Sequence, residues 1–340
     1  MLEKNTSWGV RVKKENGQTE IVIRESGGGG ISYPVPALFT RSTKSAKRFI
    51  EFFTANIRNL NTRAAYVRAV MAFTTWCEAH QLDDLDLIEP VHVASYIEGL
   101  TKTHAKPTVK QHLAAIRMLF DWLVVGQIVA INPASVVRGP KHSVKKGKTP
   151  VLSGEDARAL IDSIDTSTIV GLRDRAIIGV MVYTFARVSA VIGMKVEDFY
   201  PNGKRTYVRL HEKGGKYHEM PCNHNLEEYL EAYVKAAGLA EHPKTPLFRS
   251  SPGHSGVLTE LSMGRQDVYA MIRRRALQAA IRTRIGCHTF RATGITQYLK
   301  NGGKLEIAQR MAAHESARTT GLYDRRDDEI HLDEVERILI

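Results

Sequence analysis

The C-terminal half of the chain contains His288-Thr-Phe-Arg291 and, further on, Met311-Ala-Ala-His314-Glu-Ser-Ala-Arg-Thr-Thr-Gly-Leu-Tyr323. His314 follows the arginine by 23 residues and precedes the tyrosine by nine. Two histidines and an arginine supply hydrogen-bond donors and positive charge, and a tyrosine hydroxyl supplies a nucleophile. Such cations stabilise the negative charge on a pentacoordinate phosphorus that a phenol attacks. Each residue alone is explained by packing, but the ordered set favours phosphodiester transfer.

The motifs resemble those of the tyrosine recombinases of the phage-integrase type, and the resemblance covers residues 42–330. That family carries another arginine in an upstream box, which matches Arg173-Asp-Arg-Ala-Ile-Ile-Gly-Val-Met-Val-Tyr-Thr-Phe-Ala-Arg187-Val-Ser-Ala-Val-Ile-Gly-Met-Lys-Val-Glu-Asp198. Its hairpin lysine matches Lys213 in Tyr207-Val-Arg-Leu-His-Glu-Lys213-Gly-Gly-Lys-Tyr-His-Glu-Met-Pro221.

The resemblance implies a catalytic set that uses neither a metal nor a nucleotide cofactor. Its members are Arg187, Lys213, His288, Arg291, His314 and Tyr323. The two arginines would bind the non-bridging oxygens of the scissile phosphate, and the two histidines would hydrogen-bond it or orient the nucleophile. Lys213, with Lys216 as the nearby alternative, would protonate the departing 5′ oxygen, and Tyr323 would form a 3′-phosphotyrosyl link.

One position departs from the family pattern. Members usually carry an acidic residue three positions after the first arginine, and here that position is Ala190. Phe185-Ala186 also replaces the common Gly-Leu before the arginine. The missing carboxylate would normally brace the site from outside, so we expect Arg187 to be held differently.

Composition and charge favour a polyanionic partner. The chain has 340 residues, 43% apolar and 25% charged, and a formal net charge of +12, which suits two globular domains with a basic surface. Basic residues cluster without acids in 138–148 and, as six arginines, in 271–291. The predicted DNA-binding residues are Lys141, Lys145, Lys146, Lys148, Lys216, Arg273 and Arg274.

Five segments are predicted along the chain. Residues 1–40 form an N-terminal extension with a β-hairpin pattern around Asn16-Gly17, and 41–138 a helical, SAM-like core-binding domain. Residues 139–150 are a basic linker, 151–330 the catalytic domain, and 331–340 a C-terminal helix that docks on its own catalytic domain or on a neighbouring protomer. The predicted fold is mainly α with a small antiparallel sheet, arranged as a two-lobed DNA clamp.

Apolar periodicity supplies the expected elements of both domains. Helices are expected at 44–58, 61–80, 90–103 and 107–126 in the first domain, and at 153–164, 169–185, 189–195, 225–237, 264–282, 289–300 and 304–313 in the second. Strands 206–211 and 216–220 would flank the turn that carries Lys213.

The function predicted from these features is site-specific DNA recombination. We expect double-stranded DNA with inverted-repeat sites as partner, a homotetramer on that DNA, no membrane segment, and a cytoplasmic, nucleoid-associated location. The scattered Cys77, Cys222 and Cys287 fit a reducing compartment. Two alternatives stay open: a non-cleaving DNA-binding protein on the same fold, which Ala190 would allow, and a type IB-like topoisomerase.

Overall fold

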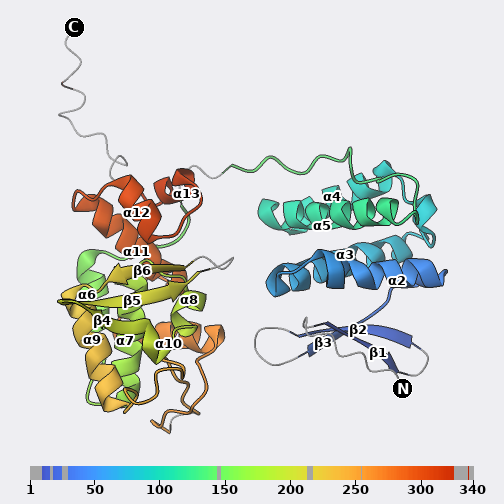
Figure 1. Cartoon of the computed structure of the whole chain (residues 1–340). Coiled ribbons are helices and arrows are strands. Elements are labelled where there is room, and N and C mark those ends of the chain that lie inside the picture. The colour runs from blue at the N-terminus through green and yellow to red at the C-terminus, as the bar shows by residue number, and fades with distance from the viewer. Residues whose placement is uncertain are drawn as a thin grey trace. The chain divides into compact units, whose positions relative to one another are not determined.

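The computed structural model describes residues 10–15, 18–24, 30–143, 147–212, 217–253, 255–324 and 336, with side chains described from Pro34 onward. The chain divides into two compact units, Met1–Ser143 and Val144–Ile340. Figure 1 shows helices in both units and a three-stranded sheet in each. The predicted fold class, mainly helical with a small antiparallel sheet, is confirmed. None of the helices in these ranges is long and apolar enough to cross a membrane.

The first unit begins with an antiparallel sheet in the order β1-β2-β3. Strands β1 (Val10–Glu15) and β2 (Gln18–Arg24) pair around the Asn16-Gly17 segment, with Val12 opposite Ile21. Strand β3 (Gly30–Pro34), which the sequence analysis did not predict, pairs with β2.

A helical bundle follows this sheet. It consists of α1 (Ala37–Thr40), α2 (Thr43–Glu51) continuing into a π-helical turn η1 (Phe52–Asn56), α3 (Leu60–Ala79), the 3₁₀ turn η2 (Leu85–Leu87), α4 (Pro90–Thr103) and α5 (Lys106–Val125). The Asn59 side chain caps α3 by accepting from two backbone N–H groups, and proline opens α4 and α5, where a missing N–H costs nothing. Buried aromatic rings, among them Phe49, Phe73 and Phe120, fill the core.

The second unit contains most of the predicted motifs. Its elements are α6 (Gly154–Asp162), α7 (Ile169–Tyr183), α8 (Val188–Ile192), the 3₁₀ turn η3 (Val196–Asp198), β4 (Phe199–Asn202), β5 (Arg205–His211), β6 (Tyr217–Pro221), α9 (His224–Ala236), α10 (Arg265–Gln278), α11 (Cys287–Lys300), α12 (Leu305–Met311) and α13 (Ala317–Gly321). The three strands are antiparallel in the order β4-β5-β6. Strand β4 and helix α13 were not predicted.

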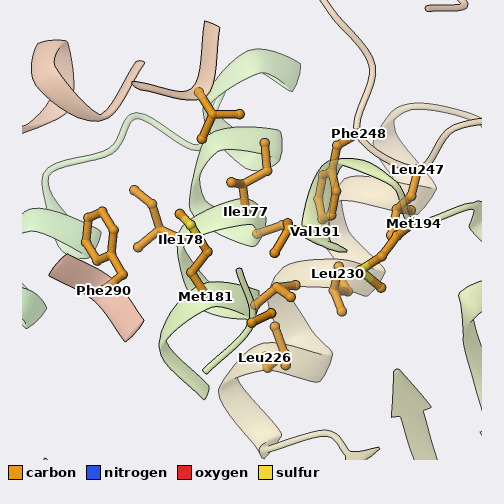
Figure 2. Close-up of a cluster of buried hydrophobic side chains, with 14 of the residues drawn as sticks. Ile177, Ile178, Met181, Val191, Met194, Leu226, Leu230, Leu247, Phe248 and Phe290 are labelled. Carbon is orange, nitrogen blue, oxygen red and sulfur yellow. The ribbon is translucent and has the colours of Figure 1, made fainter. Parts of the chain in front are cut away.

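Helix α7 forms the centre of this unit. Its side chains are buried on all sides, and Figure 2 shows Ile177, Ile178 and Met181 meeting side chains of α8, α9 and α11. The buried carboxylate of Asp174 accepts hydrogen bonds from Arg173 and from Arg275 of α10, each at 2.8 Å. This double pairing satisfies a charge that would otherwise be costly to bury, and it ties α7 to α10.

The chain reverses sharply after α7, two residues earlier than predicted. Phe185 has a φ of 56°, in the left-handed region that favours glycine, so the helix cannot continue through it. Its ring is buried and packs edge-on against Tyr298, with centroids 6.0 Å apart. The family's glycine at this position is therefore replaced by a residue that accepts backbone strain and fills a small core with Ile295 and Leu299.

Candidate active site

Arg187 begins helix α8 as its N-cap residue, directly after the reversal at Phe185. Its side chain is 31% exposed, and Nη1 donates to Oε2 of Glu212 at 2.7 Å. Its backbone N–H donates to the other carboxylate oxygen of Glu212 at 3.4 Å. The guanidinium of Arg187 is thus held through Nη1, and part of its side chain is accessible to solvent.

Arg291 lies in the middle of α11 and is almost completely buried. Its Nη1 donates to the carbonyl of Phe185, and its Nη2 donates to the carbonyl of Ala312. Burial, followed by the charge of Arg187, lowers the pKa of Arg291 to about 10, while Glu212 and Tyr323 act in the opposite direction. The guanidinium therefore stays charged at neutral pH and carries positive charge in a dry site.

His314 follows α12 and the left-handed residue Ala313. Its Nδ1 lies 2.9 Å from the hydroxyl of Thr320 in α13. Burial, and then the charges of Arg291, Arg187 and His288, lower the pKa of His314 to about 3. The imidazole is therefore neutral at pH 7, and its ring lies nearly parallel to that of Tyr323.

His288 occupies the first turn of α11, three residues before Arg291. Burial, reinforced by Arg291 and Arg187, lowers the pKa of His288 as well. Both predicted histidines are thus uncharged at neutral pH, and each can donate one hydrogen bond and accept another.

Tyr323 follows α13 and is held through its backbone. Its N–H donates to the carbonyl of Thr320 at 2.9 Å, and its own carbonyl accepts from the Thr296 hydroxyl of α11 at 3.0 Å. The preceding residue, Leu322, accepts from the N–H of Gly147 at 3.1 Å. A Cβ at Gly147 would lie 2.6 Å from that carbonyl, so only glycine allows this approach.

Five of the six predicted catalytic residues lie within each other's electrostatic influence. The charge of Arg187 acts on His288, Arg291 and His314, and Tyr323 acts on Arg291. Lys213 and its alternative Lys216 lie outside the described residues. The sequence analysis did not identify Glu212 as a site residue. The available signal was that Glu212 directly precedes Lys213 while Ala190 occupies the position where the family usually has an acid.

The predicted DNA-binding residues differ in their surroundings. Lys141, Lys148 and Arg273 are exposed. Arg274 is also exposed, but its Nη2 lies 3.4 Å from the buried carboxylate of Asp174, which partly compensates its positive charge. Lys145 and Lys146 lie outside the described residues. Within the described ranges, no three His, Cys, Asp or Glu side chains are grouped as metal ligands.

The chain matches two family models. Residues 150–329 match the phage integrase family, and residues 45–128 match the phage integrase N-terminal SAM-like domain. The chain therefore belongs to the phage integrase family, the tyrosine recombinases. As the family establishes, it is a site-specific DNA recombinase, a tyrosine-type DNA strand transferase.

Individual relatives agree with this assignment. Tyrosine recombinase XerC of Myxococcus xanthus is 30% identical over 248 residues, covering 70% of this chain and 79% of its own. Tyrosine recombinase XerD of Staphylococcus saprophyticus is 27% identical over 267 residues, covering 77% and 87%.

Two solved structures share the fold. The XerH recombinase in a post-cleavage complex with a palindromic difH substrate has a TM-score of 0.64 at 20% identity, over 87% of this chain and 83% of that chain. A lambda integrase (75–356) dimer bound to a COC′ core site has a TM-score of 0.64 at 16% identity, over 84% and 97%.

Proposed function

We propose that this recombinase uses Tyr323 as the nucleophile with which it cuts and rejoins double-stranded DNA, through a 3′-phosphotyrosyl intermediate. The observation that carries the proposal is the grouping of Arg187, His288, Arg291 and His314, with the ring of Tyr323 parallel to that of His314 and acting on Arg291. Two permanent charges and two neutral imidazoles suit a phosphodiester, because guanidinium groups match its non-bridging oxygens and neutral rings exchange hydrogen bonds with it.

The reaction balances without a cofactor. The Tyr323 oxygen forms a bond to phosphorus as the bond from phosphorus to the 5′ oxygen breaks. The phenol proton passes to a neutral imidazole of the site, that of His288 or His314, and Lys213 gives its own proton to the leaving 5′ oxygen. Arg187 and Arg291 stabilise the negative charge of the transition state. Attack of a second strand's 5′ hydroxyl on the 3′-phosphotyrosyl bond then reverses the step and regenerates the tyrosine.

The proposed partner is a duplex with inverted-repeat sites, bound by a homotetramer. In this proposal the bundle of residues 41–138, the basic segment 139–150 and the catalytic domain 151–330 clamp the DNA. The predicted C-terminal helix 331–340 lies outside the described residues except for Glu336, and it docks on its own catalytic domain or on a neighbouring protomer. The net charge of +12 and the DNA-bound recombinases of the same fold support a DNA partner. A chromosomal or mobile-element substrate places the protein in the cytoplasm, with the nucleoid.

Covalent capture tests the nucleophile. A duplex selected from a randomised library by binding to the full chain is nicked near its centre, so that cleavage releases a short fragment and traps the adduct. The wild-type chain should form an adduct stable to detergent. Tyr323→Phe, which removes only the hydroxyl, should bind the duplex equally and form none.

The same assay separates the alternatives. A wild-type chain that binds its selected duplex and never forms an adduct is a non-cleaving DNA-binding protein. Relaxation of supercoiled plasmids that lack the selected site would instead identify a topoisomerase. An adduct that persists in Tyr323→Phe would contradict the assignment of Tyr323.

A further inference from the structure

We propose that Glu212 is the positioning residue for Arg187, doing from the end of β5 what the family's acid does from the position of Ala190. The inference rests on the proposed function, since it concerns how the phosphate-binding arginine is held. Glu212 touches neither the phosphate nor the nucleophile in this role and acts only through Arg187.

The geometry at the start of α8 shows what is missing. Arg187 is the N-cap, so Ala190 stands three residues later, at the third helical position. An acid at that position reaches back to the N-cap backbone N–H in a capping box, and alanine cannot. Here Oε1 of Glu212 accepts that same N–H at 3.4 Å, while Oε2 accepts from Arg187 Nη1 at 2.7 Å.

The strand pattern explains why Glu212 points inward. Val208 and Leu210 of β5 are buried, whereas Arg209 and His211 lie on the outer face. Continuing this alternation by one step places Glu212 in the inner row, where its side chain is 1% exposed. A carboxylate buried this deeply requires a charged partner, and Arg187 provides one.

The pairing leaves the rest of Arg187 directed outward. Its Nε and Nη2 have no hydrogen-bond partner among the described residues, and 31% of the side-chain surface is exposed to solvent. One carboxylate therefore fixes the arginine on one side and leaves the N–H groups of Nε and Nη2 for a phosphate. Glu212 also directly precedes Lys213, so it joins the hairpin of the proposed general acid to the phosphate-binding arginine.

Single-turnover cleavage of the nicked duplex by the full chain tests the proposal. Glu212→Ala should lower the cleavage rate by about 100-fold with unchanged DNA affinity, because misplacing a binding group by about 1 Å costs this much. Glu219→Gln is the matched control. Glu219 lies on the same hairpin and pairs with Arg209 at 3.0 Å, but on the outer face, so this variant should cleave at the wild-type rate.

A restored acid gives the most direct check. Adding Ala190→Glu to Glu212→Ala returns a carboxylate to the N-cap of α8 and should recover at least ten-fold of the lost rate. Recovery supports the proposal. A folded double variant that binds DNA and stays as slow as Glu212→Ala overturns it.

A substrate with an uncharged linkage shows whether Glu212 positions Arg187 or only stabilises the fold. In a methylphosphonate substrate, a methyl group replaces one non-bridging oxygen, so the linkage carries no charge for an arginine to neutralise. If Glu212 acts through Arg187, Glu212→Ala and Arg187→Ala show the same ratio of rates on the two substrates, and the double variant is no slower than Arg187→Ala. Different ratios, or additive losses, overturn the proposal even where Ala190→Glu fails to fold.

The outcomes for Glu212 and for the proposed function are distinct. A wild-type chain that forms no adduct refutes the function. A wild-type chain that forms the adduct, with Glu212→Ala equally fast, leaves the function standing and refutes the role of Glu212.

Discussion

The imidazole of His314 lies parallel to the phenol ring of Tyr323, with 5.9 Å between ring centroids and 6° between planes. His314 is held by Thr320, and Tyr323 donates its N–H to the carbonyl of that same threonine. One residue of α13 therefore contacts both the imidazole of His314 and the backbone of Tyr323. Because His314 is neutral at pH 7, it packs beside the phenol ring without adding a third charge to the site.

Removing Lys213 should affect only the leaving group. We expect Lys213→Ala to cleave normal DNA slowly and to recover on a duplex with sulfur at the bridging 5′ position, because a thiolate departs without protonation. Single-turnover cleavage of both duplexes measures this, and Lys216→Ala is the matched control. Equal losses on both substrates would show that Lys213 positions the DNA and does not donate the proton.

Acid should destabilise the folded chain through His314. The unfolded chain takes up a proton near pH 6.5, whereas the folded site resists it until about pH 3, so stability is full above pH 6.5 and declines as the pH falls towards 3. One such group costs up to about 2 kcal/mol between pH 6.5 and about pH 5. Urea unfolding at several pH values measures the effect, and His314→Gln should flatten the decline. An unchanged slope in that variant would assign the acid sensitivity elsewhere.

Gly294 should tolerate no side chain. A Cβ there would lie 2.2 Å from the carbonyl oxygen of Val182 and 2.9 Å from ring carbons of Phe185, so α11 would have to move away from α7. We expect Gly294→Ala to cost about 2 kcal/mol of unfolding free energy and to displace Arg291, which lies on the same helix. Gly99→Ala in α4 is the control, since nothing lies within 4 Å and alanine favours the helix by about 0.5–1 kcal/mol. Equal stability of the two variants would contradict the close packing of α7 and α11.

The basic segment should contribute to DNA affinity through counterion release. Replacing Lys145, Lys146 and Lys148 with alanine should reduce the slope of log K against log salt by about 0.9 for each lost phosphate contact. Fluorescence anisotropy with the selected duplex over a range of salt concentrations gives the slope. Replacing Lys204, Lys235 and Lys244 with alanine, all three outside this segment, removes the same number of charges and reports the effect of net charge alone. A slope equal to that of this control would place the segment away from the DNA.

Much of the fold could be predicted from local signals. Ser153 caps α6 by accepting from the Asp156 N–H, as serine before two acids indicates, and the apolar run of α7 reads directly as a buried helix. Two of the short elements that were missed, both in the second unit, have weak signals. Strand β4 has four residues including a proline, and α13 has five.

The relative positions of the site residues were predictable only where the residues belong to one continuous motif. His288 and Arg291 share one helix, so their separation follows from the sequence. The pairing of Glu212 with Arg187 joins a strand end to a helix start, and no periodicity connects them. The left-handed backbone at Phe185 could not be predicted either, because it also depends on tertiary contacts. A bulky residue adopts this backbone conformation only when burial of its ring offsets the strain.

The hydrogen bond between Gly147 and Leu322 attaches the linker directly to the segment that carries Tyr323. The chain entering the catalytic unit is thus hydrogen-bonded one residue before Tyr323, the proposed nucleophile, so a pull on the linker acts on the peptide that carries this tyrosine. A displacement large enough to break one hydrogen bond releases Leu322 from this restraint. Tyr323 itself has separate backbone hydrogen bonds to Thr320 and Thr296, so the linker adds a further restraint to a segment that is already anchored on α11 and α13.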